Sequence, residues 1–162
     1  MPTATIALGS NLGDRAANLT TAIAHLNERG RVTAISPVYE TPPWGVADQP
    51  AYYNQVVQVQ TELAPHALLH ALKETEAELG RDPGGLRYGP RLIDFDIVLY
   101  GDLVLTSYSL TIPHPRLIER AFVLVPLADI APDLIHPRLG LTVRELLARV
   151  DANGVVRVEA GG

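Results

Sequence analysis

The spacing of apolar residues changes along the N-terminal part of the chain, and each change predicts a different element. The run 4–8 (Ala-Thr-Ile-Ala-Leu) is almost entirely apolar and ends at Gly9, which predicts a buried strand. Apolar residues then recur at helical spacing from Leu19 to Leu26, and a glycine at position 30 ends the predicted helix. Residues 32–38 predict a second strand.

The pattern continues with a second set of elements. Valine and glutamine alternate over 56–61, which predicts a half-buried strand. A helix is predicted over 65–79, with proline at its start and glycine after its end, and a further strand over 93–100. The order β-α-β-β-α-β is the ferredoxin-like arrangement of an α+β sandwich. That order is common to many binding modules and indicates no particular function.

The C-terminal part adds elements to this sandwich. The sequence predicts a short hairpin-like stretch up to Ile112, a Pro-His-Pro turn, an apolar segment over 117–127 and a final helix over 143–150. The 162 residues fit one domain that spans 1–162.

Composition narrows the class of protein. The net charge of −5 argues against broad binding to nucleic acid or to an acidic membrane. No apolar run approaches the roughly 18 residues of a membrane helix, and no basic segment precedes the first apolar run, so a cytoplasmic protein is expected. The absence of cysteine excludes disulfides and leaves oxygen and nitrogen ligands for any metal.

The most informative local pattern is Asp94-Phe95-Asp96 within the apolar strand 93–100. Because side chains alternate along a strand, Phe95, Ile97 and Leu99 are expected on one face and the two acids on the other, roughly 7 Å apart at the backbone. Paired carboxylates suit Mg²⁺ or Mn²⁺, and two such ions suit phosphoryl transfer. A solvent-facing edge strand that carries two acids is the alternative.

The loop that precedes this strand, 80–91, is rich in glycine and contains Arg81, Arg87 and Arg91. Guanidinium groups on a glycine-rich loop can close over a polyphosphate, and a solvated basic loop is the alternative. Glu76 lies on or beside the apolar stripe of the preceding helix, where a carboxylate needs a partner. It is either a nucleotide-site residue or a boundary residue whose carboxylate reaches water.

Three further side chains could bind a flat heterocycle. Tyr52 and Asn54 alternate onto one face at the start of a strand, and Phe122 offers another ring, although a residue of each kind, taken alone, is more often part of the core. The position of His114 between two prolines does not by itself identify a ligand.

Several familiar signatures are absent. The turn 9–13 (Gly-Ser-Asn-Leu-Gly) follows a strand but matches neither the Rossmann nor the P-loop fingerprint. The chain also lacks a G-x-S-x-G elbow and a histidine cluster of the zinc type.

Several blocks of sequence, in this order, resemble the 6-hydroxymethyl-7,8-dihydropterin pyrophosphokinase family. They are Gly9–Asp14, Thr41–Gly45, Tyr52–Asn54, Arg87–Asp96, Ile112–Arg116, Glu119–Leu124 and Pro126-Leu127. The resemblance covers roughly residues 3 to 137, and its most specific part is Gly-Pro-Arg-x-x-Asp-x-Asp. It implies a ferredoxin-like monomer that uses ATP and two Mg²⁺ ions and transfers pyrophosphate to the pterin.

The resemblance also implies roles for individual residues. Asp94 and Asp96 would bind both ions, and the catalytic set would be Arg81, Arg91, Asp94 and Asp96. The pterin pocket would be lined by Thr41, Pro43, Trp44, Tyr52, Asn54, Asp94 and Phe122. ATP would be surrounded by Glu76, Arg81, Arg87, Arg91, Ile97, Thr111, Ile112, His114 and Arg120. The chain departs from the family pattern at Lys73, Pro83, Tyr88, Phe95 and Pro115, none of which is an expected metal ligand.

Three other interpretations of the residues remain open at this stage. A ferredoxin-like regulatory module would bind a small molecule without chemistry, and a nucleotidyltransferase would use the same acids and release pyrophosphate. A purely structural domain would leave the polar strand face and the arginine loop unexplained.

Overall fold

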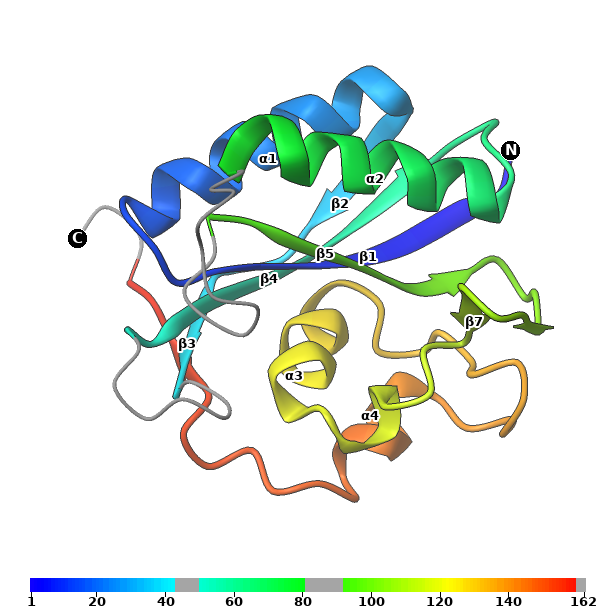
Figure 1. Cartoon of the computed structure of the whole chain (residues 1–162). Coiled ribbons are helices and arrows are strands. Elements are labelled where there is room, and N and C mark those ends of the chain that lie inside the picture. The colour runs from blue at the N-terminus through cyan, green and yellow to red at the C-terminus, as the bar shows by residue number, and fades with distance from the viewer. Residues whose placement is uncertain (43–49, 81–91, 160–162) are drawn as a thin grey trace.

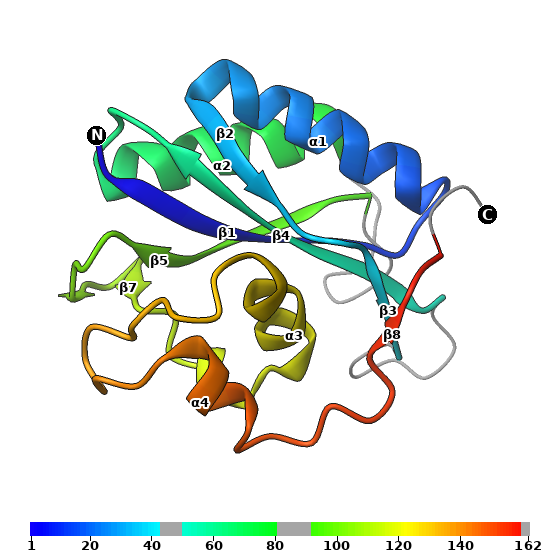
Figure 2. The same ribbon diagram turned by 180° about the vertical axis from the view of Figure 1, so that it is seen from behind.

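The protein is built as helices on both faces of one twisted antiparallel sheet (Figures 1 and 2). The computed structural model describes residues 1–42, 50–80 and 92–159. None of the helices in these ranges has the length and apolarity needed to span a membrane.

In the part of the chain that the structure describes, six strands form the main sheet, in the order β5-β1-β4-β3-β8, with β2 also paired to β4. Every pairing in this sheet is antiparallel. The strands are β1 (Thr3–Ser10), β2 (Arg31–Ile35), β3 (Tyr39–Thr41), β4 (Tyr52–Gln60), β5 (Asp94–Tyr100) and β8 (Val156–Arg157). A separate hairpin is formed by β6 (Leu105–Thr106) and β7 (Thr111–Ile112).

Two long helices cover one face of the sheet, α1 (Arg15–Arg29) and α2 (Pro65–Gly80) (Figure 1). The helix-face core between them and the sheet includes Ile6, Leu19, Leu26, Leu68, Leu72 and Phe95. The opposite face is covered by α3 (Ala121–Ile130) and α4 (Val143–Leu147), with the short 3₁₀ turn η1 (Leu117–Glu119) before α3. The α3-face core includes Val56, Val98, Leu99, Val123, Leu124, Leu127 and Leu146.

The predicted second strand is interrupted by a bend after Ile35. One strand was expected over 32–38, whereas β2 ends at Ile35 and β3 begins at Tyr39, and both strands pair with β4. Ser36 lies at the bend, and its hydroxyl accepts a hydrogen bond from the Val56 N–H at 2.9 Å. The Gln55 side chain donates to the Ser36 carbonyl at 2.8 Å, so β4 stays bonded across the bend.

The first half of β5 alternates as the sequence predicts. Phe95 and Ile97 are buried in the helix-face core, whereas Asp94 is partly exposed and Asp96 exposed on the other face. The two acids therefore lie on the face that α3 only partly covers, and the prediction for this half of the strand is confirmed.

The prediction that Leu99 shares the face of Ile97 is wrong, because β5 contains a bulge. Thr5 of β1 pairs with Leu99 but the next residue, Ile6, pairs with Ile97, so Val98 is the extra residue. Val98 and Leu99 consequently both pack in the α3-face core. A bulge of this kind changes the alternation within one strand, and a single sequence gives little sign of it.

The C-terminal helix is shorter than expected. Instead of continuing to Val150, α4 ends at Leu147. Its start is fixed by a capping box in which the Thr142 hydroxyl accepts from the Glu145 N–H at 3.1 Å. The strand β8, which the sequence analysis did not predict, then pairs with the outer edge of β3 (Figure 2).

Candidate active site

A cavity of about 530 Å³ lies where several elements end on the α3 side of the sheet. Its walls come from the ends of β1, β3, β4 and β5, from the segment around η1 and from the start of α3. The described residues that line it are Ala7, Leu8, Gly9, Thr41, Tyr52, Asn54, Asp94, Asp96, Arg116, Glu119, Arg120, Phe122 and Val123.

Gly9 is a residue of β1 that lines the cavity without a side chain. In the sheet it pairs with Asn54 on one side and with Asp94 on the other. A Cβ atom at this position would lie 3.3 Å from the Asn54 Oδ1 and 3.4 Å from the Tyr52 ring. The missing side chain therefore leaves the ring and the amide accessible from the cavity.

The polar pair Asn54 and Thr41 forms one buried side of the cavity. The Asn54 Nδ2 donates to the Thr41 Oγ1 at 2.6 Å, and both residues are less than a tenth exposed. The bond fixes the orientation of the amide, so that its Oδ1 is left to accept and the threonine hydroxyl is left to donate. A pair of this kind suits the edge of a heterocycle that carries both N–H and carbonyl groups.

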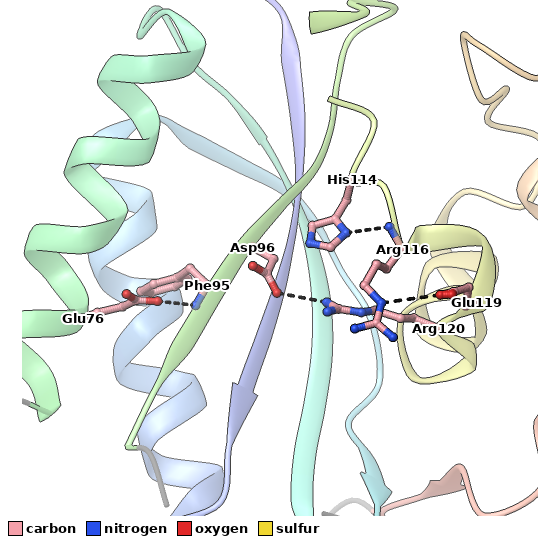
Figure 3. A network of polar contacts seen from close by, with 7 residues as sticks. All are labelled: Glu76, Phe95, Asp96, His114, Arg116, Glu119 and Arg120. Atoms are coloured by element: carbon pink, nitrogen blue, oxygen red, sulfur yellow. Dashed lines mark hydrogen bonds and ion pairs between the residues drawn. The ribbon is translucent and has the colours of Figure 1, made fainter. Parts of the chain in front are cut away.

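A basic residue stands over the acidic end of the cavity. The Arg120 Nη1 lies 3.3 Å from the Asp96 Oδ2, as Figure 3 shows. The same guanidinium lies 5.6 Å from the centre of the Phe122 ring. Because Asp96 remains half exposed, its carboxylate can still take a further partner beside the arginine.

His114 lies next to these charges and its position depends on the β5 bulge. Its backbone N–H donates to the carbonyl of Val98, the bulge residue, at 2.9 Å. Its Nδ1 accepts the Arg116 N–H at 3.1 Å (Figure 3), so the neutral ring carries its proton on Nε2. Burial lowers the pKa of His114, and the charge of Asp96 opposes that shift. The imidazole is therefore a neutral donor at pH 7.

Two charged residues of the cavity wall, Arg116 and Glu119, were not among the predicted site residues. The Arg116 Nε lies 3.4 Å from the Glu119 Oε1, and both side chains are largely exposed. The two residues are three apart in the chain, a spacing at which side chains meet in a helical turn. In the sequence, Arg116 comes two residues after His114 and Glu119 immediately precedes Arg120. This closeness to predicted site residues could have identified both.

Glu76 lies on the opposite side of β5 from Asp96 (Figure 3). Its Oε2 accepts the Phe95 N–H at 2.7 Å, and its Oε1 lies 3.5 Å from the Lys73 Nζ. Among the described residues β5 is an edge strand, so this N–H has no neighbouring strand there to bond to, and Glu76 supplies the acceptor. The carboxylate therefore has a structural partner.

The structure brings together part of the predicted site. The cavity is lined by the predicted pterin residues Thr41, Tyr52, Asn54, Asp94 and Phe122 and by the predicted ATP residue Arg120. Ile97 and Ile112 are instead buried in the helix-face core, and Thr111 is partly buried on β7. The predicted residues Pro43, Trp44, Arg81, Arg87 and Arg91 lie outside the described residues.

The donor set at the acidic end fits a divalent cation that is shared with a substrate. Asp94 and Asp96 supply the hard carboxylate oxygens that Mg²⁺ prefers. No group of three or more His, Asp or Glu side chains within 1–42, 50–80 and 92–159 is placed to hold a metal. Water and substrate oxygens would therefore have to complete the coordination, as is usual for Mg²⁺ at phosphate-transfer sites.

Comparison with known proteins supports one family. Residues 5–132 match the family model described as 7,8-dihydro-6-hydroxymethylpterin-pyrophosphokinase (HPPK). The chain is 48% identical over 161 residues to a 2-amino-4-hydroxy-6-hydroxymethyldihydropteridine pyrophosphokinase of Methylorubrum extorquens. The aligned region covers 98% of this chain and 100% of that protein. It is 43% identical to the protein of that name from Pseudomonas aeruginosa, over 94% of each chain.

Other relatives are much longer. The chain is 47% identical to the folic acid synthesis protein fol1 of Pneumocystis carinii, but spans only 20% of that protein. Among solved structures, HPPK-DHPS from Plasmodium falciparum superposes with a TM-score of 0.74 at 18% identity, over 91% of this chain and 44% of that one. That likeness concerns the fold. On the family match and the near full-length bacterial relatives, the chain belongs to the 7,8-dihydro-6-hydroxymethylpterin-pyrophosphokinase family.

Proposed function

We propose that the cavity is where this chain transfers pyrophosphate from ATP to the hydroxymethyl group of 6-hydroxymethyl-7,8-dihydropterin, a step of folate biosynthesis. The proposal rests on one observation. The aromatic ring of Tyr52 and the amide of Asn54 line the same cavity as the carboxylates of Asp94 and Asp96. We further assign the fold to the ferredoxin-like arrangement, because the order is β-α-β-β-α-β when β2 and β3 are counted as one interrupted strand. We treat 1–162 as one domain that acts as a monomer. A cytoplasmic location stays a prediction of the sequence.

The flat pterin would bind between Tyr52 and Phe122. Both residues line the cavity, one from β4 and the other from the first turn of α3. Aromatic faces on opposite walls can stack on a planar heterocycle. The Asn54 Oδ1 would accept from the ring edge and the Thr41 hydroxyl would donate to it, which selects a ring with alternating N–H and carbonyl groups.

Asp94 and Asp96 would hold Mg²⁺, and we propose two ions. Bound Mg²⁺ would neutralise the phosphate oxygens and polarise the phosphorus that is attacked. The protein's own contribution is to keep two carboxylates on one strand face beside the pterin wall. Arg120 offsets part of their charge without closing off Asp96, which is half exposed.

In the reaction, the hydroxymethyl oxygen would bond to the β-phosphorus of ATP. The bond from that phosphorus to the oxygen bridging the α- and β-phosphates breaks, and AMP leaves with the bridging oxygen. The hydroxyl proton would pass to Asp94, which lines the cavity, or to water. Arg120, and the Nε2–H of His114, would donate to phosphate oxygens and stabilise the charge that builds up there.

Other residues of the predicted site keep proposed roles. Arg81 and Arg91 would complete the catalytic set and Arg87 the phosphate contacts, as the family resemblance implies. For Glu76, Ile97, Thr111 and Ile112, a place around ATP also rests on that resemblance alone. The hydrogen bond to Phe95 favours a supporting part for Glu76, since it holds the strand that carries both acids.

Incubation of the enzyme with ATP, Mg²⁺ and the dihydropterin tests the proposal. The expected products are AMP and the pyrophosphorylated pterin in equal amounts, with no reaction after chelation of the metal. Release of pyrophosphate with an adenylylated product would instead identify a nucleotidyltransferase, and absence of turnover would identify a binding module.

A further inference from the structure

The turn that follows β1 makes contacts that the proposed reaction does not use. The Asn11 Nδ2 donates to the Pro50 carbonyl at 3.3 Å, and the Arg15 Nη1 donates to the Ala51 carbonyl at 2.8 Å. Pro50 and Ala51 are the two residues immediately before Tyr52, which forms a wall of the cavity. The turn therefore binds the backbone that leads into this wall.

Arg15 also contacts Tyr53, the residue that follows Tyr52 in the chain. Its guanidinium carbon lies 3.9 Å from the centre of the Tyr53 ring, at stacking distance. The same Nη1 lies 3.3 Å from the Glu40 Oε2, and Glu40 is the residue of β3 that pairs with Tyr53. One side chain thus contacts the residue before Tyr52, the residue after it and the neighbouring strand.

These contacts lie on the face of the sheet away from the cavity. Along β4, Tyr52 faces the cavity whereas Tyr53 packs against the helix-face core. Arg15 is not among the described residues that line the cavity, and its side chain is only 26% exposed. Any effect of Arg15 on the substrate must therefore pass through the strands it contacts, and Tyr52 is the cavity residue whose two chain neighbours both bind Arg15.

The turn holds Arg15 in a fixed place. The Asp14 carboxylate accepts the Ala17 N–H at 3.1 Å and caps α1, of which Arg15 is the first residue. The Asn18 Nδ2 donates back to the Leu12 carbonyl at 2.8 Å. A side chain that starts from a capped helix end can hold its partners with little further loss of conformational freedom.

We propose that Arg15 is a positioning residue for the pterin, which holds the Tyr52 ring in place from the opposite face of the sheet. This inference rests on the proposed assignment of Tyr52 to the pterin site. A guanidinium is required because a planar group can stack on Tyr53 while its edge donates to a carbonyl and a carboxylate. A lysine ammonium at the same place keeps the charge but cannot do both.

The test compares Arg15→Met and Arg15→Lys with a matched variant at the other end of α1. Arg29→Met is that control, because Arg29 pairs with Glu74 at 3.7 Å and is not among the described residues that line the cavity. Calorimetry measures the dihydropterin Kd on enzyme saturated with α,β-methylene-ATP, and separately the Kd of that analogue. Both Arg15 variants are expected to raise the pterin Kd about tenfold and to change the analogue Kd less than about twofold, as is expected when one wall loses its preorganisation.

A double-mutant cycle with Tyr52→Ala then identifies the route of the effect. In the Tyr52→Ala background, Arg15→Met is expected to leave the pterin Kd nearly unchanged, since the ring it positions is absent. An equally large effect in that background, an equal effect on the ATP analogue, or no effect in the wild-type background would each overturn the role of Arg15. If Tyr52→Ala weakens pterin binding and Arg15→Met does not, the proposed site stands and only this inference fails. If Tyr52→Ala leaves the pterin Kd unchanged, the pterin assignment fails first.

Discussion

The two faces of the sheet use the same strands for different purposes. On the helix face, α1 and α2 cover the strands, and Ile6, Leu19 and Leu26 are no more than 1% exposed. On the other face, α3 and α4 cover only part of the strands, and a cavity with exposed carboxylate remains beside them. The alternation of β5 places Phe95 on one face and Asp96 on the other, one residue apart. Substitutions at Phe95 should therefore affect stability, and substitutions at Asp96 should affect catalysis, although the two residues are neighbours.

The largest effect is expected for Asp94→Ala or Asp96→Ala. Neither truncation opens a cavity in a core, so the melting temperature should stay close to that of the wild type. Turnover should fall about a thousandfold or more, or about 4 kcal/mol of transition-state stabilisation, because the proposed metal site would lose a carboxylate ligand. The rate of AMP formation at fixed Mg²⁺ measures it, and near-normal AMP production by a folded variant would contradict the metal assignment.

Replacing the residue between the acids should have the opposite consequence. Phe95→Ala removes a ring that is 3% exposed in the helix-face core and should lower the unfolding free energy by about 3 to 4 kcal/mol. The fraction that remains folded should turn over at a rate close to wild type. Urea titration gives the stability change, and Phe95→Leu is the milder control. A large loss of kcat without loss of stability would mean that the two faces are not separable here.

A smaller effect, confined to one substrate, is expected for Phe122→Ala. Loss of a stacking ring should weaken pterin binding by about 1 to 3 kcal/mol and leave ATP binding almost unchanged. Phe122 is only partly buried, so stability should change little. Calorimetric titration of each substrate checks this, and an equal loss of ATP affinity would indicate a core role instead.

At the edge of the sheet, Glu76→Ala should mainly affect stability. It leaves the partly buried Phe95 N–H without its acceptor, at an expected cost of about 1 to 2 kcal/mol. Glu76→Gln keeps an oxygen acceptor and should recover most of that loss. Thermal unfolding of both variants measures the difference. Equal destabilisation by both would show that the charge, and not the hydrogen bond, is what matters.

The smallest effect is a pH dependence of stability at His136, which is not among the described residues that line the cavity. Burial lowers the pKa of His136 below 6.5, and its Nδ1 accepts the N–H groups of Arg138 and Leu139. Because the unfolded chain takes up the proton first as pH falls, this contribution to stability is present above pH 6.5 and declines below it. His136→Asn should flatten the urea-midpoint profile between pH 7 and 5, and an unchanged profile would assign the dependence to other groups.

The sequence predicted the sandwich well, because apolar periodicity marks elements that bury one face. The bounds of α2 and the polar face of Asp94 and Asp96 are examples. It failed at Leu99, where a one-residue bulge changes the face without changing composition. It could not predict that Glu76 bonds to Phe95, since that contact depends on which strand forms the edge. Arg15 was missed because its partners are distant in sequence and meet only after β3 and β4 pair.

The two-residue strand β8 covers a strand edge at which two molecules could otherwise pair. It occupies the outer side of β3, where Tyr39 pairs with Arg157 and Glu40 with Val156, and the Val158 N–H continues the contact to the Val38 carbonyl. An uncovered strand edge is a template for pairing with a strand of another molecule. We therefore expect the C-terminal segment to limit self-association, and a variant shortened before Val156 should be more prone to dimerise or precipitate when concentrated.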